Sequence, residues 1–222
     1  MFAISWLLTI REGGSGLGLL LGRMDRHFFY VLDGLGANMP GDLLDGEWWR
    51  LVTAMFLHGG LLHIGLNMWV LLDVGPNVEQ VYGSPRFFFL YVVTGAFGYA
   101  VSSLVGHFSV GASGALMGLI GLMIAITTRR GGASMRMLRG RLLMWVGSIF
   151  LIGFLMPGID NSAHFGGLLS GFLLGRVFAD REPVPGAELK RAYALGWLAG
   201  LALAASFALM ALQFFHSAAA VG

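Results

Sequence analysis

Long apolar runs separated by short polar links make up most of the chain. From residue 51 onward the runs cover residues 51–72, 87–105, 113–128, 142–156, 163–179 and 192–215. A bilayer's hydrocarbon core is about 30 Å thick and takes roughly 20 helical residues to cross. A further run, residues 2–22, is split by Arg11 and Glu12, and a charge near the bilayer centre costs about 2.5–3.5 kcal/mol. The pattern predicts an all-α, polytopic membrane helix bundle with six spans, or seven if residues 2–22 also cross.

Composition supports a membrane protein and narrows its chemistry. Of 222 residues, 56% are hydrophobic and 12% are charged, whereas a soluble domain carries about 25% charged residues. The chain has no cysteine, which removes disulfides, thiol catalysis and thiolate metal sites. We expect a surrounding lipid bilayer, no nucleic-acid partner and no cofactor. No basic segment precedes the apolar residues 2–10 and no cleavage-like site follows them, so no cleavable signal peptide is expected.

Arginines set the expected orientation of the spans. Residues 129–141 contain five arginines and no acidic residue, and basic loops of this kind face the cytoplasm. Alternation of the spans then places Arg176, Arg181, Lys190 and Arg191 on the same side. Short loops and a compact layout are typical of prokaryotic proteins, so we expect a multi-pass protein of a prokaryotic inner membrane.

Polar side chains recur at a similar depth on three spans that run in the same direction. Ser113 lies sixteen residues before Arg129, and His164 lies twelve residues before Arg176 and sixteen before Asp180. His63 and Asn67 share one helix face by their i, i+4 spacing, and they lie ten and six residues before Asp73, the expected end of their span. Polar side chains inside a membrane face the protein interior or a water-filled cavity. We therefore expect the four side chains to converge below the outer surface.

A serine and a histidine in this setting suit nucleophilic catalysis. A hydroxyl is a weak nucleophile until a base takes its proton, and imidazole titrates near neutral pH. His164 is the candidate base for Ser113, and the glycines that follow it would let the two helices pack closely. The Ser113 N–H, the Asn67 amide and the His63 imidazole can stabilise an oxyanion. No Asp or Glu lies within the spans to orient His164, so a dyad is expected rather than a triad.

Each feature also has a structural explanation when it is taken alone. Glycines such as Gly114 and Gly118 are common where membrane helices touch, and an asparagine such as Asn67 commonly bonds a neighbouring helix. His164 alone would more often be a hydrogen-bonded interior histidine. His58 and His63 could form a pair at the membrane interface without any chemistry. Trp49 and Arg50 could anchor the chain at that interface. These explanations do not predict that the serine, histidine and asparagine share one side and one depth.

A transporter or metal site built from His58, His63 and His164 is another interpretation. Proton and cation pathways normally include intramembrane carboxylates, whereas Asp73 and Asp160 are expected at span ends. The chain also lacks the H-E-x-x-H motif of zinc proteases. We therefore expect no metal ion.

Four motifs together resemble the rhomboid intramembrane serine proteases. They occur in the family's order and cover roughly residues 45–180. The motifs are Glu47-Trp48-Trp49-Arg50, the H-x₄-H-x₃-N set of His58, His63 and Asn67, Gly111-Ala112-Ser113-Gly114, and Ala163-His164-Phe165-Gly166-Gly167 with Gly171. The resemblance implies a six-helix protease core over residues 1–190 and an additional transmembrane helix over residues 191–222.

The resemblance also implies roles for single residues. Ser113 would be the nucleophile and His164 the base of a serine endopeptidase that cleaves transmembrane protein substrates near the outer face. The residues implied for the oxyanion hole or substrate binding are His63, Asn67, Gly111 and Gly114. The residues implied for structural support are Trp49, Arg50, His58 and Gly167. Many relatives carry an aromatic residue four positions after the serine, where this chain has Met117. The alternative is a proteolytically inactive rhomboid-like protein that binds membrane helices.

Overall fold

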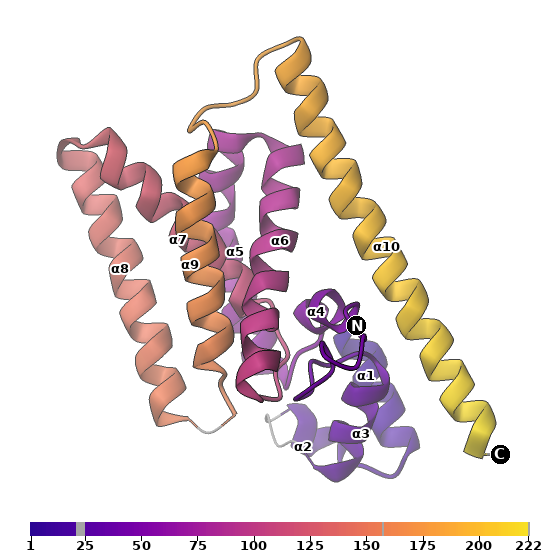
Figure 1. The fold of residues 1–222 in the computed structure, drawn as a ribbon. Helices are drawn as coiled ribbons and strands as arrows, with labels where there is room; N and C mark the ends of the chain where they lie inside the picture. Colours follow the sequence, from indigo (N-terminus) through magenta and orange to yellow (C-terminus); the bar gives the residue numbers. More distant parts are fainter. Residues whose placement is uncertain (21–24, 157, 222) are drawn as a thin grey trace.

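The chain folds as an all-helical bundle in the computed structural model, which describes residues 1–20, 25–156 and 158–221 (Figure 1). The all-α prediction is therefore confirmed. In chain order the elements are α1 (Phe2–Arg11), α2 (Gly16–Leu20), α3 (Arg26–Gly34), α4 (Arg50–Thr53), the 3₁₀ helix η1 (Ala54–Phe56), α5 (Leu61–Tyr82), α6 (Ser84–Val105), α7 (Ser113–Arg130), α8 (Gly132–Leu155), α9 (Asn161–Val177) and α10 (Ala187–Val221).

The first predicted span, residues 2–22, is not a continuous helix. α1 ends at Arg11, Gly13 turns the chain with a φ of +89°, and α2 follows with five residues. A ten-residue helix is about 15 Å long, which is half of a hydrocarbon core. Residues 2–20 therefore do not form the possible seventh span as one helix, because the chain leaves the helix at Arg11–Glu12; residues 21 and 22 lie outside the described part.

The predicted span 51–72 is misplaced. α4 and η1 form a short helical segment that meets α5 at a bend of 96°, so the long helix starts only at Leu61 and continues to Tyr82. Asp73 and Pro76, expected at the end of the span, lie inside α5. Asp73 therefore does not mark the end of the span, and His63 lies in the first turn of α5, as Ser113 and His164 lie in the first turns of α7 and α9.

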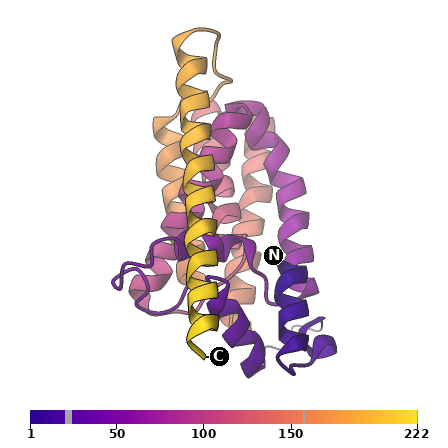
Figure 2. The ribbon, with the colours of Figure 1, turned by 90° about the vertical axis from the view of Figure 1, so that its right-hand side faces the viewer.

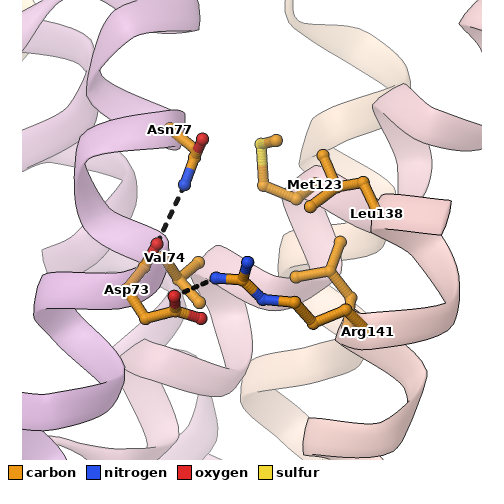
Figure 3. A pocket seen from close by; sticks show the side chains of 7 residues that line it. Asp73, Val74, Asn77, Met123, Leu138 and Arg141 are labelled. Atoms are coloured by element: carbon orange, nitrogen blue, oxygen red, sulfur yellow. Dashed lines mark hydrogen bonds and ion pairs between the residues drawn. The ribbon is translucent and has the colours of Figure 1, made fainter. Parts of the chain in front are cut away.

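Asp73 is tolerated inside α5 because side chains of α8 compensate its charge. The Arg141 guanidinium pairs with the Asp73 carboxylate (Figure 3). The Trp145 indole N–H donates to Asp73 Oδ2 at 3.1 Å. The Trp145 ring also meets the Trp69 ring edge-on at 5.2 Å. This polar contact matters for α8, because Leu142 is the only buried residue in that fully described helix.

The basic segment 129–141 is not a loop. α7 ends at Arg130 and α8 begins at Gly132, so most of the predicted loop is helical. Gly131 and Gly132 have φ values of +66° and +84°, which L side chains rarely adopt, so two glycines can reverse the chain without a loop. The arginines that lie on α8 rather than in a loop are Arg136, Arg139 and Arg141.

Several helices are long and apolar enough to cross a membrane. Among the described residues these are α6, α8 and α10, and the bent pair of α4–η1 with α5 makes a fourth candidate. α7 and α9 have 18 and 17 residues and are shorter than a typical span. The polytopic bundle is therefore confirmed, whereas helix length and composition give three to four candidate spans where the sequence predicts six or seven.

α7 packs at the centre of the bundle against α6 and α9, and α10 runs lengthwise along one side (Figure 2). Glycines make the α7–α9 contact unusually close. A Cβ added at Gly167 would overlap the Gly114 carbonyl oxygen, and one added at Gly171 would overlap the Gly118 carbonyl oxygen. The backbones of α7 and α9 therefore touch directly, as small residues allow between membrane helices.

Candidate active site

The backbone contact between α7 and α9 brings two polar side chains together. Ser113 is the first residue of α7, and His164 lies in the first turn of α9. Ser113 Oγ lies 2.8 Å from His164 Nε2, which is hydrogen-bond distance. The imidazole is 3% exposed and the serine is half-buried. A hydroxyl and a buried imidazole at this distance form a pair in which the imidazole can take the hydroxyl proton.

Gly111 shapes the space beside this pair. Its φ of +122° favours glycine, and its N–H donates to the Ala54 carbonyl at 2.9 Å. Its own carbonyl accepts a hydrogen bond from the Tyr99 hydroxyl at 2.5 Å. A Cβ at position 111 would lie 2.6 Å from His63 Nε2 and 3.4 Å from Asn67 Nδ2. A side chain at position 111 would collide with the His63 nitrogen. Only glycine therefore leaves this corner beside Ser113 open, so that the two nitrogen donors can approach the start of α7.

The donor character of these nitrogens follows from their partners. The Gly59 N–H donates to His63 Nδ1 at 3.2 Å, so a neutral His63 carries its proton on Nε2, next to Gly111. Asn67 Nδ2 is buried and has no hydrogen-bond partner among the described residues, which is costly unless something polar visits the site. The Ser113 N–H lies at the first position of α7, where no intrahelical carbonyl is available. Each of these three N–H groups can therefore donate a hydrogen bond near the start of α7.

His58 packs against His63. Its ring meets the His63 ring edge-on with centroids 5.2 Å apart. The side chain is buried, and neither ring nitrogen has a partner among the residues that the structure describes. Its contact therefore bears on the orientation of His63 and not on Ser113 directly.

Trp49 and Arg50 lie outside the Ser113–His164 contact. The segment before Arg50 contains α3, and the buried Arg50 guanidinium bonds several groups of this segment. It donates to the Asp33 carbonyl at 2.8 Å and to the Ala37 carbonyl at 3.0 Å. The carboxylates paired with Arg50 are those of Asp33, Asp42 and Glu47. The Trp49 ring packs edge-on against Trp48. The contacts of Arg50 therefore join the start of α4 to the segment that contains α3.

Sequence reasoning missed the residues that surround His164. Asn161 Oδ1 lies 3.4 Å from His164 Nδ1, and the Phe150 ring on α8 meets the imidazole edge-on at 6.2 Å. Met117 is fully buried in the main core cluster, and the aromatic ring beside the imidazole comes from α8. Asn161 lies in the polar link expected over residues 157–162, so it did not stand out from its neighbours. The Asp-Asn-Ser sequence of this link is typical of a helix start and is the signal that could have located it.

Asp160 begins α9 and also joins it to the link before α7. Its carboxylate accepts hydrogen bonds from the Ser162 N–H at 2.8 Å and the Ala163 N–H at 3.3 Å, which is an N-cap. Asp160 Oδ1 also lies 3.1 Å from His107 Nδ1. Burial opposes the charged form, but hydrogen bonds including those from Ser162 and His107 outweigh it, so the pKa of Asp160 is lowered below its usual 3.8.

The histidines are not arranged as a metal site. Within residues 1–20, 25–156 and 158–221, no three His, Cys, Asp or Glu side chains form a group that could hold a metal ion. His58 and His63 are neighbours, whereas the partner of His164 Nε2 is the serine hydroxyl.

Comparison with known proteins identifies the family. The rhomboid domain matches residues 45–181. The chain is 43% identical over 149 residues to RHOMBOID-like protein 5 of Arabidopsis thaliana, which covers 64% of this chain and 48% of the relative. It is 34% identical over 174 residues to Rhomboid protease GluP of Bacillus subtilis (strain 168), and this match covers 78% of this chain and 34% of the relative. It is 35% identical over 156 residues to Rhomboid-like protease 1 of Toxoplasma gondii, and this match covers 67% of this chain and 53% of the relative.

The chain spans about a third to a half of the length of these relatives. The matched domain nevertheless covers more than half of this chain, from residue 45 to residue 181. It contains α4 to α9 and every residue of the Ser113 site described above. This multi-pass membrane protein therefore belongs to the rhomboid family.

Proposed function

We propose that this chain is an intramembrane serine endopeptidase that cleaves transmembrane segments of membrane proteins with Ser113 and His164 as a catalytic dyad. The observation that carries the proposal is the 2.8 Å distance between Ser113 Oγ and His164 Nε2. It is supported by the open corner at Gly111, where donors of His63 and Asn67 approach. Relatives named as rhomboid proteases share the matched region.

The reaction follows from the positions of these groups. His164 Nε2 takes the proton of the Ser113 hydroxyl as Oγ attacks the carbonyl carbon of the scissile bond. The negative charge that develops on the carbonyl oxygen is stabilised by the Ser113 N–H, His63 Nε2–H and the Asn67 amide. His164 then gives the proton to the departing amine. A water molecule, deprotonated by the same imidazole, hydrolyses the acyl-enzyme and restores Ser113.

The site is proposed to face the outer side of the membrane. The N-terminal ends of α5, α7 and α9 lie at one end of the bundle, together with α1 to α4 (Figure 1). Arginines gather at the opposite end, where α7 meets α8 and where Arg130 pairs with Asp180. The end that is rich in basic residues is expected in the cytoplasm. A substrate helix would therefore be cut near its outer end, where water can reach Ser113.

The proposed domain arrangement takes residues 1–190 as the protease core and the rest as an added helix. α10 begins at Ala187 and packs along α6 and α4 on the outside of the bundle. None of its described side chains takes part in the contacts of Ser113 or His164. Its contribution near the core is structural, since Gln213 donates to Glu47 Oε1 at 2.7 Å.

The test is cleavage of a model single-span substrate by the full chain in liposomes, combined with labelling by a serine-directed phosphonate. Wild type should cleave and become labelled, and Ser113→Ala and His164→Ala should do neither. Ser206→Ala is the matched control, because this buried serine lies on α10 and its only hydrogen-bond partner among the described residues is the Ala202 carbonyl. Cleavage by Ser113→Ala at the wild-type rate would refute the proposal. A folded wild type that neither cleaves nor labels would instead support the inactive, helix-binding alternative.

A further inference from the structure

We propose that Asn161 is a positioning residue that holds His164 in the tautomer protonated on Nδ1, with α8 fixing the asparagine in place. This inference rests on the proposed function of Ser113 and His164. It assigns to α8, the least buried long helix of the bundle, a part in the geometry of the base.

The orientation of the Asn161 amide follows from its two neighbours. Nδ2 lies 3.3 Å from the carbonyl oxygen of Phe150 on α8, and Oδ1 lies 3.4 Å from His164 Nδ1. A carbonyl oxygen only accepts hydrogen bonds, so the amide NH₂ must face Phe150. The side-chain oxygen is then the atom that faces the imidazole. The flipped amide would set two oxygens against each other.

This orientation selects the tautomer of His164. Because Asn161 Oδ1 only accepts, the neighbouring Nδ1 must carry the proton. In the neutral imidazole Nε2 is then unprotonated, and it can accept the Ser113 hydroxyl proton across 2.8 Å. The other tautomer would direct an N–H at the serine and could not act as its base. The asparagine thus plays the part that an acidic residue plays in a triad.

The Asn161 side chain packs against α8 at a glycine. A Cβ at Gly153 would overlap Asn161 Oδ1 and lie 2.7 Å from its Cγ, so only glycine at position 153 leaves room for the amide. One turn earlier, Phe150 supplies both the carbonyl that binds Nδ2 and the ring that meets His164 edge-on. Two contacts of α8 therefore act on the imidazole, one directly and one through Asn161.

The expected size of the effect follows from the length of the contact. At 3.4 Å the Oδ1–Nδ1 separation is longer than the 2.7–3.2 Å of ordinary hydrogen bonds, and neither partner is charged. Loss of the orienting carboxylate of a serine protease triad costs about 10⁴-fold in kcat. For a longer and uncharged contact we expect about a 10-fold loss.

The experiment compares Asn161→Ala, Asn161→Asp and Gly153→Ala in the detergent-solubilised full chain. We expect Asn161→Ala and Gly153→Ala to lower kcat and the phosphonate labelling rate about 10-fold with KM unchanged. Asn161→Asp keeps an acceptor at Nδ1 but loses the donor to the Phe150 carbonyl, so at neutral pH it should retain more activity than Asn161→Ala. Its carboxylate favours the imidazolium, so the acidic limb of its pH–rate profile should move to higher pH. Asn77→Ala is the matched control, since Asn77 is an exposed asparagine that bonds the Asp73 carbonyl of its own helix.

A second readout does not depend on activity. In the ¹⁵N spectrum of histidine-labelled protein, the His164 signals are those lost in His164→Ala. They should show an Nδ1–H tautomer in wild type and in Asn161→Asp, and a mixture of tautomers in Asn161→Ala. Unchanged tautomer and unchanged kcat in Asn161→Ala would overturn the inference. The same holds if Asn161→Ala only lowers the melting temperature while its labelling rate per folded molecule stays at the wild-type value.

Failure of the inference can be distinguished from failure of the proposed function. A wild type that cleaves, together with an Asn161→Ala variant that cleaves equally well, leaves the Ser113–His164 assignment intact and removes only the role of Asn161. A wild type that neither cleaves nor labels removes the proposed function, and the tautomer measurement then still reports whether Asn161 orients the imidazole.

Discussion

The α-carbon of Gly167 on α9 lies so close to the Gly114 carbonyl oxygen of α7 that a side chain at position 167 would overlap it. This contact is one residue from Ser113 in one helix and three residues from His164 in the other. The distance between the hydroxyl and the imidazole is therefore set by backbone packing.

Gly167→Ala should separate α7 from α9 and uncouple the dyad. Overpacking a fitted interior costs about 1–3 kcal/mol, and here the obstacle is backbone that cannot rotate away, so the upper end is expected. Thermal unfolding in detergent should show the loss of stability, and phosphonate labelling should fall with it. Gly140→Ala on α8 is the control, because nothing lies within 4 Å of a Cβ there. It should stabilise by up to about 1 kcal/mol through helix propensity, and equal destabilisation by both variants would contradict the packing explanation.

Gly111→Ala should impair catalysis while both dyad residues remain. The new Cβ would meet His63 Nε2 at 2.6 Å in a backbone conformation with φ of +122°. We expect the kcat of peptide cleavage to fall by about 10²–10³-fold, which is the loss seen when one oxyanion donor is removed. The measurement is kcat with a model substrate, with circular dichroism to verify folding. A folded Gly111→Ala protein with wild-type kcat would show that this corner does not hold the oxyanion.

Breaking the contact between Asp73 and Arg141 should cost more than removing both charges. Arg141→Leu leaves the Asp73 carboxylate inside α5 with only Trp145 as a partner, and an unpaired charge within a membrane helix costs about 2.5–3.5 kcal/mol on insertion scales. The double variant Asp73→Asn/Arg141→Leu should recover much of that loss. A double-mutant cycle on unfolding free energy in detergent measures the coupling. Strict additivity of the two substitutions would show that the contact in Figure 3 contributes nothing.

Stability should fall at low pH through Asp160. Its pKa is lower in the folded protein than the usual 3.8, so its charged form stabilises the fold above that value. The contribution is lost as the pH falls from about 4 through the folded-state pKa. Asp160→Ala should cost about 0.5–2 kcal/mol at neutral pH, the range for loss of an N-cap.

Asp160→Asn separates the cap from the charge. Asparagine is an equally good N-cap, so this variant should retain most of the stability at neutral pH and lose the pH dependence of that contribution. Melting temperatures between pH 2 and pH 7 provide the measurement. An Asp160→Asn protein that is as unstable as Asp160→Ala would indicate that the carboxylate charge, and not the cap, holds the start of α9.

Much of the layout was predictable because hydropathy reports it directly. The runs 87–105, 113–128 and 163–179 correspond closely to α6, α7 and α9, since each lies between polar links. Ser113, His164, His63 and Asn67 stand out in the sequence because a polar side chain in an apolar run needs a reason. Their catalytic roles remain predictions for the experiments above.

By itself, the sequence determined that the chain is an all-helical, polytopic membrane protein with a polar cluster on helices that run in the same direction. Only the tertiary structure decided where α5 begins, why Asp73 can lie inside it, and which side chain faces Nδ1 of His164. The physical reason is that an apolar run has the same hydropathy whether it meets lipid or another helix. A charge or an amide inside such a run is tolerated only when it has a partner. Asp73 finds its partners on α8, and Asn161 is held by the Phe150 carbonyl of the same helix. No local sequence pattern encodes that α8 approaches these residues.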